Sequence, residues 1–128
     1  CGISLFHTSN GNLTRTFKIF IGHTTKTSFN STTDWEPITS LTEVYSGSII
    51  FTSNNWTYIN FDIPFMYDGS QNIIIGIDDN TQIIDSAVAN TFKYTTSSNK
   101  AIYFNSNLIN PNFSTPPSGT ISGDRNNI

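Results

Sequence analysis

Residues 14–21 read TRTFKIFI, and polar and apolar side chains alternate along most of this stretch. Successive side chains of an extended chain point to opposite faces, so Phe17, Ile19 and Ile21 share one face. The opposite face carries Thr16, Lys18 and Phe20. This pattern is typical of a β-strand that packs one face against a core.

Short stretches of similar character recur along the chain and are separated by turn-forming residues. They are residues 3–7, 44–51, 56–63, 72–77, 91–95 and 101–105. Asn10-Gly11 and Ser53-Asn54-Asn55 are typical of turns between strands, and Gly47 indicates a β-bulge. The stretch at 72–77 is apolar almost throughout, which predicts a central strand covered on both faces. We therefore predict an all-β fold, a jelly-roll-like antiparallel β-sandwich of about seven or eight strands.

The chain of 128 residues has the length of a single domain. The predicted strands place the β-sandwich module at residues 1–106. Residues 107–128 are rich in Pro, Asn, Ser and Gly, with Asn110-Pro111 and Pro116-Pro117 as breakers. We expect them to form a terminal arm or linker with little structure of its own.

Composition narrows the classes of partner. Charged residues make up 12% of the chain, aromatic residues 13%, and the net charge is −3. Disordered chains have few aromatic residues and high net charge, so this composition favours a folded domain. Lys and Arg occur singly and form no patch, which argues against binding of nucleic acid. No apolar run reaches the ~18–20 residues of a membrane helix, so we expect no membrane span.

A set of short motifs is spread over about residues 3–105. They are Thr14-Arg15-Thr16, Ile19-Phe20, Thr27-Ser28-Phe29, Thr33-Asp34-Trp35, Val44-Tyr45-Ser46-Gly47, Trp56, Pro64-Phe65, Tyr67-Asp68-Gly69, Asn72-Ile73 and Asp78-Asp79-Asn80-Thr81. In this combination the chain resembles a β-sandwich module that recurs in large secreted proteins of the Bacteroidetes. These modules are similar to the adhesin-type, cleaved-adhesin-like jelly-roll domains of gingipains.

The resemblance implies a protein that is secreted or displayed on a bacterial cell surface. It also implies neighbouring modules in the same polypeptide, which catalyse reactions or anchor the protein. Modules of this type are variously adhesive, carbohydrate-binding or architectural, so the resemblance leaves the ligand open.

The resemblance further implies one strand upstream of residues 3–7 and a closing strand near residues 125–128. If either strand is missing from this chain, a sheet edge is left unpaired. Unpaired edges accept strands from other chains. Self-association through open sheet edges is therefore one hypothesis for how the module acts.

Catalytic motifs are not evident. His7 and His23 stand in separate segments, and the sequence has no GxSxG, HExxH or phosphate-binding glycine loop. A carboxylate pair remains open, and its members would come from Asp62, Asp68, Asp78, Asp79 and Asp85. Aspartates that form turns explain these positions more simply, so we predict that the chain is not an enzyme.

Asp78, Asp79 and Asn80 bring several hard oxygen atoms into one predicted loop, which suits Ca²⁺. The resemblance supports a structural calcium, because jelly-roll modules often hold one. A plain turn with hydrogen bonds from side chain to backbone explains the same residues and is the simpler interpretation.

Aromatic residues are the most informative candidates for binding. Trp35 and Trp56 coincide with recurring positions of the resembling modules, where packing is the simpler role. Tyr58 differs, because it lies on a predicted polar strand face beside Asn60 and Asp62. An aromatic ring on such a face can bind the apolar side of a sugar, while amides and carboxylates address the hydroxyl groups. An ordinary cross-strand packing role for Tyr58 is the alternative.

The leading hypothesis is a non-catalytic extracellular accessory module that binds carbohydrate or a glycan-bearing surface for a larger secreted protein. The alternative is a structural or adhesive module, or a filament-type subunit, that acts through protein–protein contacts and donated strands. A fragment of a glycoside hydrolase or peptidase ranks third.

Overall fold

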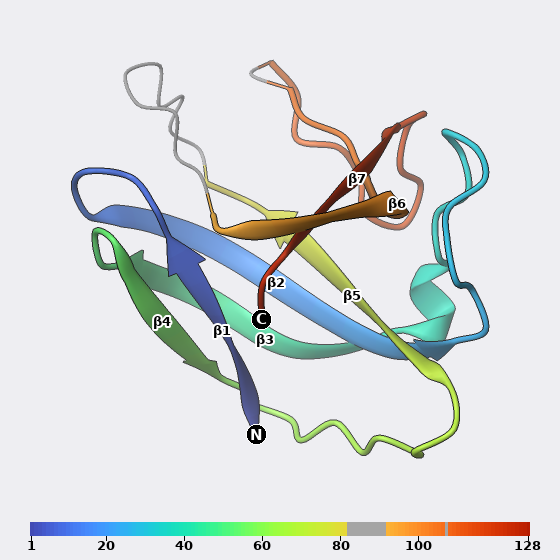
Figure 1. The fold of residues 1–128 in the computed structure, drawn as a ribbon, viewed down its shortest axis with the longest axis horizontal. Helices are drawn as coiled ribbons and strands as arrows, with labels where there is room; N and C mark the ends of the chain where they lie inside the picture. Colours follow the sequence, from blue (N-terminus) through green and yellow to red (C-terminus); the bar gives the residue numbers. More distant parts are fainter. Residues whose placement is uncertain (82–91, 107) are drawn as a thin grey trace.

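The central sheet is antiparallel and has the strand order β3-β2-β5 (Figure 1). Its strands are β2 (Leu13–Thr24), β3 (Thr42–Phe51) and β5 (Asn72–Asp79). The structure is a computed structural model that describes residues 1–81, 92–106 and 108–128. β2 is the middle strand of the sheet. Over its second half, the side chains on both faces of the strand are buried, which suits this position.

A second antiparallel sheet joins β1 (Gly2–His7) to β4 (Asn55–Asn60) and packs on the central sheet. The alternation predicted for residues 14–21 is confirmed, because Phe17, Ile19 and Ile21 all lie in the core between the sheets. The buried core consists of Leu5, Leu13, Phe17, Ile19, Ile21, Val44, Ile49, Phe51 and Ile59. Burial of each such side chain contributes ~1.5–3 kcal/mol to folding.

A third antiparallel pair, β6 (Tyr94–Tyr103) with β7 (Thr120–Asn126), extends from the first two sheets (Figure 1). The backbone N–H of Lys93 donates to the carbonyl of Phe6 at 2.8 Å, which ties this pair to β1. The predicted all-β, antiparallel β-sandwich is thus confirmed, with seven strands among the described residues. The same residues contain no helix that is both long and apolar enough to span a bilayer.

The β-bulge lies at Val44 and not at Gly47, where we predicted it. Tyr45 pairs with Ile19 and Glu43 pairs with Phe20, so Val44 is the extra residue. Its side chain is fully buried in the core, and its carbonyl accepts the N–H of Asp62 at 2.8 Å. The bulge therefore follows from a core contact and a backbone contact, and a glycine is not required.

Two predicted strand assignments change. β4 ends at Asn60 and not at residue 63, because β1 offers no partner beyond Cys1 and the N–H of Asp62 turns to the carbonyl of Val44. The two strands predicted at 91–95 and 101–105 form the single strand β6, with an irregular register between Thr96 and Ala101. Position 91 itself lies outside the described residues.

The prediction for residues 72–77 is wrong in one respect. They form β5 as expected, but β5 stands at the edge of the central sheet and pairs only with β2 among the described strands. Ile73 is 47% exposed, and the following apolar residues of the strand are only half-buried.

The expectation of a tail with little structure is also wrong. Residues 120–126 form β7, and the ring of Phe113 stacks on Phe20 on the outer face of β2. Trp35 pins the long connection after β2 to this tail, since its Nε1–H donates to the carbonyl of Pro117 at 2.9 Å. Polar, Pro-rich sequence can form a strand here because the backbone ladder with β6 is independent of side-chain hydrophobicity. The proposed boundary between residues 106 and 107 stays a prediction.

Candidate functional site

Two aromatic side chains stand on the outer face of the β1–β4 sheet. Along β4 the inward side chain of Ile59 is buried in the core, whereas Trp56 and Tyr58 are 48% and 60% exposed. Antiparallel pairing sets Trp56 opposite Phe6 and Tyr58 opposite Ser4. The predicted alternation along this strand is confirmed, and it leaves an aromatic pair facing solvent.

Contacts with β1 hold both rings. Trp56 meets Phe6 edge-to-face, with centroids 5.4 Å apart and planes at 77°. A Cβ atom at Gly2 would lie 2.8 Å from Cζ and from Oη of Tyr58, so this ring lies directly over the glycine. A paired strand backbone and a close neighbour restrict the ring before any ligand arrives, which lowers the entropy lost on binding.

Tyr58 also borders a shallow hollow where β4 faces β3. The hollow has a volume of about 410 Å³. The polar and aromatic residues that line it are Tyr45, Ser48, Thr57, Tyr58, Asn60 and Asp62, and its apolar part includes Ile50. The structure thus brings together Tyr58, Asn60 and Asp62, the three residues that the sequence analysis grouped.

Hydrogen bonds fix the polar groups of this hollow. Asp62 is held on both sides, because its N–H donates to Val44 and its Oδ2 accepts the N–H of Ser46 at 3.4 Å. The hydroxyl of Tyr45 donates to the carbonyl of Ser48 at 3.3 Å. The hollow therefore offers a flat ring, an exposed amide and a positioned carboxylate, a set that can hold a ring with several hydroxyl groups.

No pattern in the sequence indicated that Ser48 and Ile50 belong to a site. These residues belong to β3, and β3 meets β4 through the chain reversal at Ser53-Asn54. Asn54 has φ of +49°, which suits a tight turn of that kind. The predicted turn thus indicated that the two strands are neighbours, and from it their side chains could have been assigned to one site.

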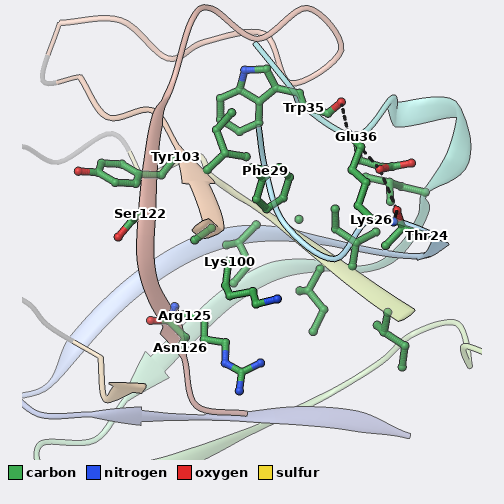
Figure 2. A pocket seen from close by; sticks show the side chains of 18 of the residues that line it. Thr24, Lys26, Phe29, Trp35, Glu36, Lys100, Tyr103, Ser122, Arg125 and Asn126 are labelled. Atoms are coloured by element: carbon green, nitrogen blue, oxygen red, sulfur yellow. Dashed lines mark hydrogen bonds and ion pairs between the residues drawn. The ribbon is translucent and has the colours of Figure 1, made fainter. Parts of the chain in front are cut away.

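Trp35 lies elsewhere. Its ring is half-buried, it donates to Pro117, and a Cβ at Gly119 would lie 2.6 Å from its Cζ2. Trp35 lines a different and larger cleft, with a volume of about 1250 Å³, together with residues of β5, β6 and β7 (Figure 2). Trp35 and Tyr58 therefore do not belong to the same site. Trp35 makes packing contacts, as expected if its role is structural.

The segment considered for calcium is only partly a loop. Asp78 and Asp79 are the last two residues of β5, and neighbouring strand residues point to opposite faces. Asp79 accepts the N–H of Thr81 at 3.0 Å and lies 3.9 Å from Arg15. Asp78 accepts from the side-chain amide of Asn80 at 2.9 Å. Asp78 and Asp79 therefore both have protein partners, and calcium at this segment stays a prediction.

The two histidines lie in different environments. His7 is fully buried between Phe51 and Phe92, and neither ring nitrogen has a hydrogen-bond partner among the described residues. His23 lies beside Phe65, and its Nε2 accepts the N–H of Asp68 at 3.1 Å. Asp85, the fifth carboxylate considered for catalysis, lies outside the described residues.

Comparison of the chain with protein-family models, with curated proteins and with solved structures finds no match.

Proposed function

We propose that the chain is a non-catalytic carbohydrate-binding module that contacts its ligand through Tyr58 and the hollow beside it. The observation that carries this proposal is the exposure of Tyr58 on a sheet face, at the border of a hollow that also contains Asn60 and Asp62. Isolated aromatic rings are common on surfaces, but a ring beside a polar hollow fits a ligand with one apolar and one polar side.

Sugars have this two-sided character. Their C–H faces pack on aromatic rings, and their hydroxyl groups exchange hydrogen bonds with amides and carboxylates. Tyr58 supplies the ring, while Asn60 and Asp62 supply a donor and acceptors within the same hollow. Trp56 stands two residues away on the same face of β4, ~7 Å along the strand, and could contact a second sugar unit.

The charge of the hollow selects the kind of glycan. The described residues that line it include a carboxylate, Asp62, and no Lys, Arg or His. An acidic sugar would meet this carboxylate without a compensating cation, which is unfavourable. We therefore expect neutral glycans to be the ligands.

The cellular setting of the proposal rests on the resemblance described above. A secreted or cell-surface protein of the Bacteroidetes, with this module beside others in one polypeptide, would use such a surface to hold the protein on a glycan. A jelly-roll connectivity belongs to the same expectation.

The test is a glycan-array and polysaccharide-affinity screen of the purified chain. We expect saturable binding to one class of neutral glycan, and loss of that binding in Tyr58→Ala with an unchanged circular dichroism spectrum. Tyr94→Ala is the matched control, because Tyr94 is a strand tyrosine with similar exposure, 54%, and lies outside the hollow. Absence of binding across neutral plant, host and microbial glycans would contradict the proposal.

A second candidate is a structural or adhesive module that acts through strand addition. One observation favours it: β5 is apolar along most of its length, yet β2 is its only strand partner among the described residues.

A further inference from the structure

We infer that the cleft between β5 and the β6–β7 pair is a binding site for an extended peptide, which adds to the free edge of β5 as a β-strand. This site is distinct from the hollow at Tyr58. It is formed by the larger cleft in Figure 2, whose walls include residues of β5, β6 and β7.

One edge of the β5 backbone is unpaired among the described residues. All 8 of its residues pair with β2 in regular antiparallel register, from Asn72 opposite Thr24 to Asp79 opposite Phe17. Within residues 1–81, 92–106 and 108–128, no strand pairs with its other edge. Every second residue of an edge strand directs its N–H and C=O groups outward, where they can pair with another chain.

β5 also lacks features that commonly prevent an edge strand from pairing with other chains. Edge strands commonly carry Lys, Pro or a bulge that discourages pairing with other chains. β5 reads NIIIGIDD, with none of these features in its pairing with β2. β3, at the opposite edge of the sheet, does carry them in part, since it has the bulge at Val44 and the exposed polar residues Ser46 and Ser48.

Both faces of β5 are apolar and lie against other parts of the protein. Ile75 and Ile77 pack against the core of the sandwich. On the other face, a Cβ at Gly76 would lie 2.8 Å from the ring of Phe113. A strand added beside β5 would continue into the same layer, so it needs apolar side chains on both of its faces.

The size of the cleft fits one strand. A strand residue rises ~3.3 Å, neighbouring strands lie ~4.8 Å apart and stacked sheets lie ~10 Å apart, so one added residue fills ~160 Å³. The cleft of about 1250 Å³ therefore has room for ~8 residues, which is the length of β5. A second folded copy would bring its whole sandwich to this edge, and the cleft is bounded on its far side by β6 and β7 of the same chain. The occupant is therefore a separate extended peptide.

Two cations of the cleft indicate which kind of peptide would bind there. Figure 2 shows the side chains of Lys100 and Arg125 extending into the cleft from β6 and β7. Lys100 donates to the carbonyl of Thr27, and neither cation takes part in an ion pair among the described residues. Lys26, which also lines the cleft, is already paired with Asp34 at 2.9 Å.

Four carboxylates also line the cleft, those of Glu36, Asp78, Asp79 and Asp124, and each has a partner within the chain. Asp79 lies 3.9 Å from Arg15, and Asp78 accepts from the side-chain amide of Asn80 at 2.9 Å. Glu36 lies 3.5 Å from Lys26, and Asp124 accepts the hydroxyl of Thr96 at 2.8 Å. Lys100 and Arg125, by contrast, have no carboxylate partner among the described residues. They favour a peptide with at least one carboxylate.

The probe for the test is a fluorescein-labelled synthetic peptide with the sequence of residues 72–79. It is apolar on both faces and carries two carboxylates at one end. We expect saturable binding by fluorescence anisotropy and, in the complex, slower hydrogen exchange of the outward amides of β5. The same peptide with Pro substituted at two central positions cannot pair along the edge and should not bind.

Ile73→Lys places a charge on the exposed start of the edge and should weaken binding by about tenfold or more. Ile63→Lys is the matched control, because Ile63 has similar exposure, 53%, and lines neither the cleft nor the hollow. Arg125→Ala should weaken binding of the same probe about threefold to tenfold, and Tyr58→Ala should leave it unchanged.

Three results would overturn the inference. The first is the absence of peptide binding by the folded chain, and the second is binding without protection of β5. The third is a concentration-dependent dimer that Ile73→Lys dissolves while the peptide fails to bind, which would assign the edge to a second copy.

Discussion

The ring of Phe113 stacks on the ring of Phe20, with centroids 4.4 Å apart and planes within 13°. Phe20 belongs to the face of β2 that points away from the core of the sandwich, and it is nevertheless buried. This contact fastens the segment before β7 to the central sheet. It explains why a Pro-rich and Asn-rich tail is held in place, and why the second face of β2 carries a phenylalanine.

Truncation of this contact should destabilise the fold. We expect Phe113→Ala to lower the free energy of unfolding by ~2 kcal/mol, because it exposes Phe20 and leaves a space over β2. Urea denaturation followed by tryptophan fluorescence measures the change. Leu108→Ala, at an exposed position of the same segment, should stay within ~0.5 kcal/mol. Equal stability of the Phe113→Ala variant and the unmodified chain would mean that the stacking of Phe113 on Phe20 contributes nothing to the fold.

The tyrosine at the hollow allows the ring and the hydroxyl to be tested separately. If the proposed sugar stacking carries the binding, Tyr58→Phe should keep affinity within about threefold, while Tyr58→Ala should lose about tenfold or more. Isothermal titration with the glycan selected in the screen measures both. Equal losses in the two variants would place the binding energy in the hydroxyl and not in the ring.

His7 is a buried polar residue that the core could replace. Its ring lies between Phe51 and Phe92, with both nitrogens unpaired among the described residues. We expect His7→Phe to raise the free energy of unfolding by ~1 kcal/mol, because it removes buried polar atoms and keeps a flat aromatic ring at this position. His7→Ala should instead lower it by ~2–4 kcal/mol, because it leaves a cavity. A loss of stability in His7→Phe would show that the imidazole has a partner that a phenyl ring cannot replace.

The turn at Tyr67-Asp68-Gly69 should weaken in acid. Oδ1 of Asp68 accepts the N–H groups of Ser70 at 2.9 Å and Gln71 at 3.1 Å, and these bonds lower the pKa of Asp68 below its usual 3.8. Its contribution to stability is therefore present above pH 3.8 and is lost as the pH falls through the lowered pKa.

Comparison with the Asp68→Asn variant tests whether the stability contributed by Asp68 is lost in acid. The unmodified chain should melt at a higher temperature than the variant near neutral pH, and the gap should close as the pH falls below 3.8. Thermal melts at a series of pH values measure it. A gap that stays constant over this range would show that the charge of Asp68 does not stabilise the turn.

Metal dependence can be settled by melting in calcium and in EDTA. Because the carboxylates of Asp78 and Asp79 point to opposite faces of β5 and have protein partners, we expect the same melting temperature in both. A rise in calcium that disappears in Asp78→Asn would instead support a calcium site at the end of β5.

Much of the fold could be predicted from local pattern. The alternation in residues 14–21 and in Trp56, Tyr58 and Ile59 assigns each side chain to a face, and the structure agrees. The grouping of Tyr58 with Asn60 and Asp62 follows from the same period of two along the chain, extended by the bond from Asp62 to the bulge at Val44. These are properties of neighbours in sequence, so they can be predicted without knowledge of the fold.

Local sequence pattern therefore shows which segments are extended and which side of each is apolar. The tertiary structure decided the rest: the edge position of β5, the use of a polar tail as β7, the contact of Phe113 with Phe20, and the cleft with Lys100 and Arg125 on its wall. The physical reason is that strand pairing uses backbone groups that are the same in nearly every residue. Hydrophobic pattern selects a face, but the choice of partner strand depends on long-range packing, which no local pattern records.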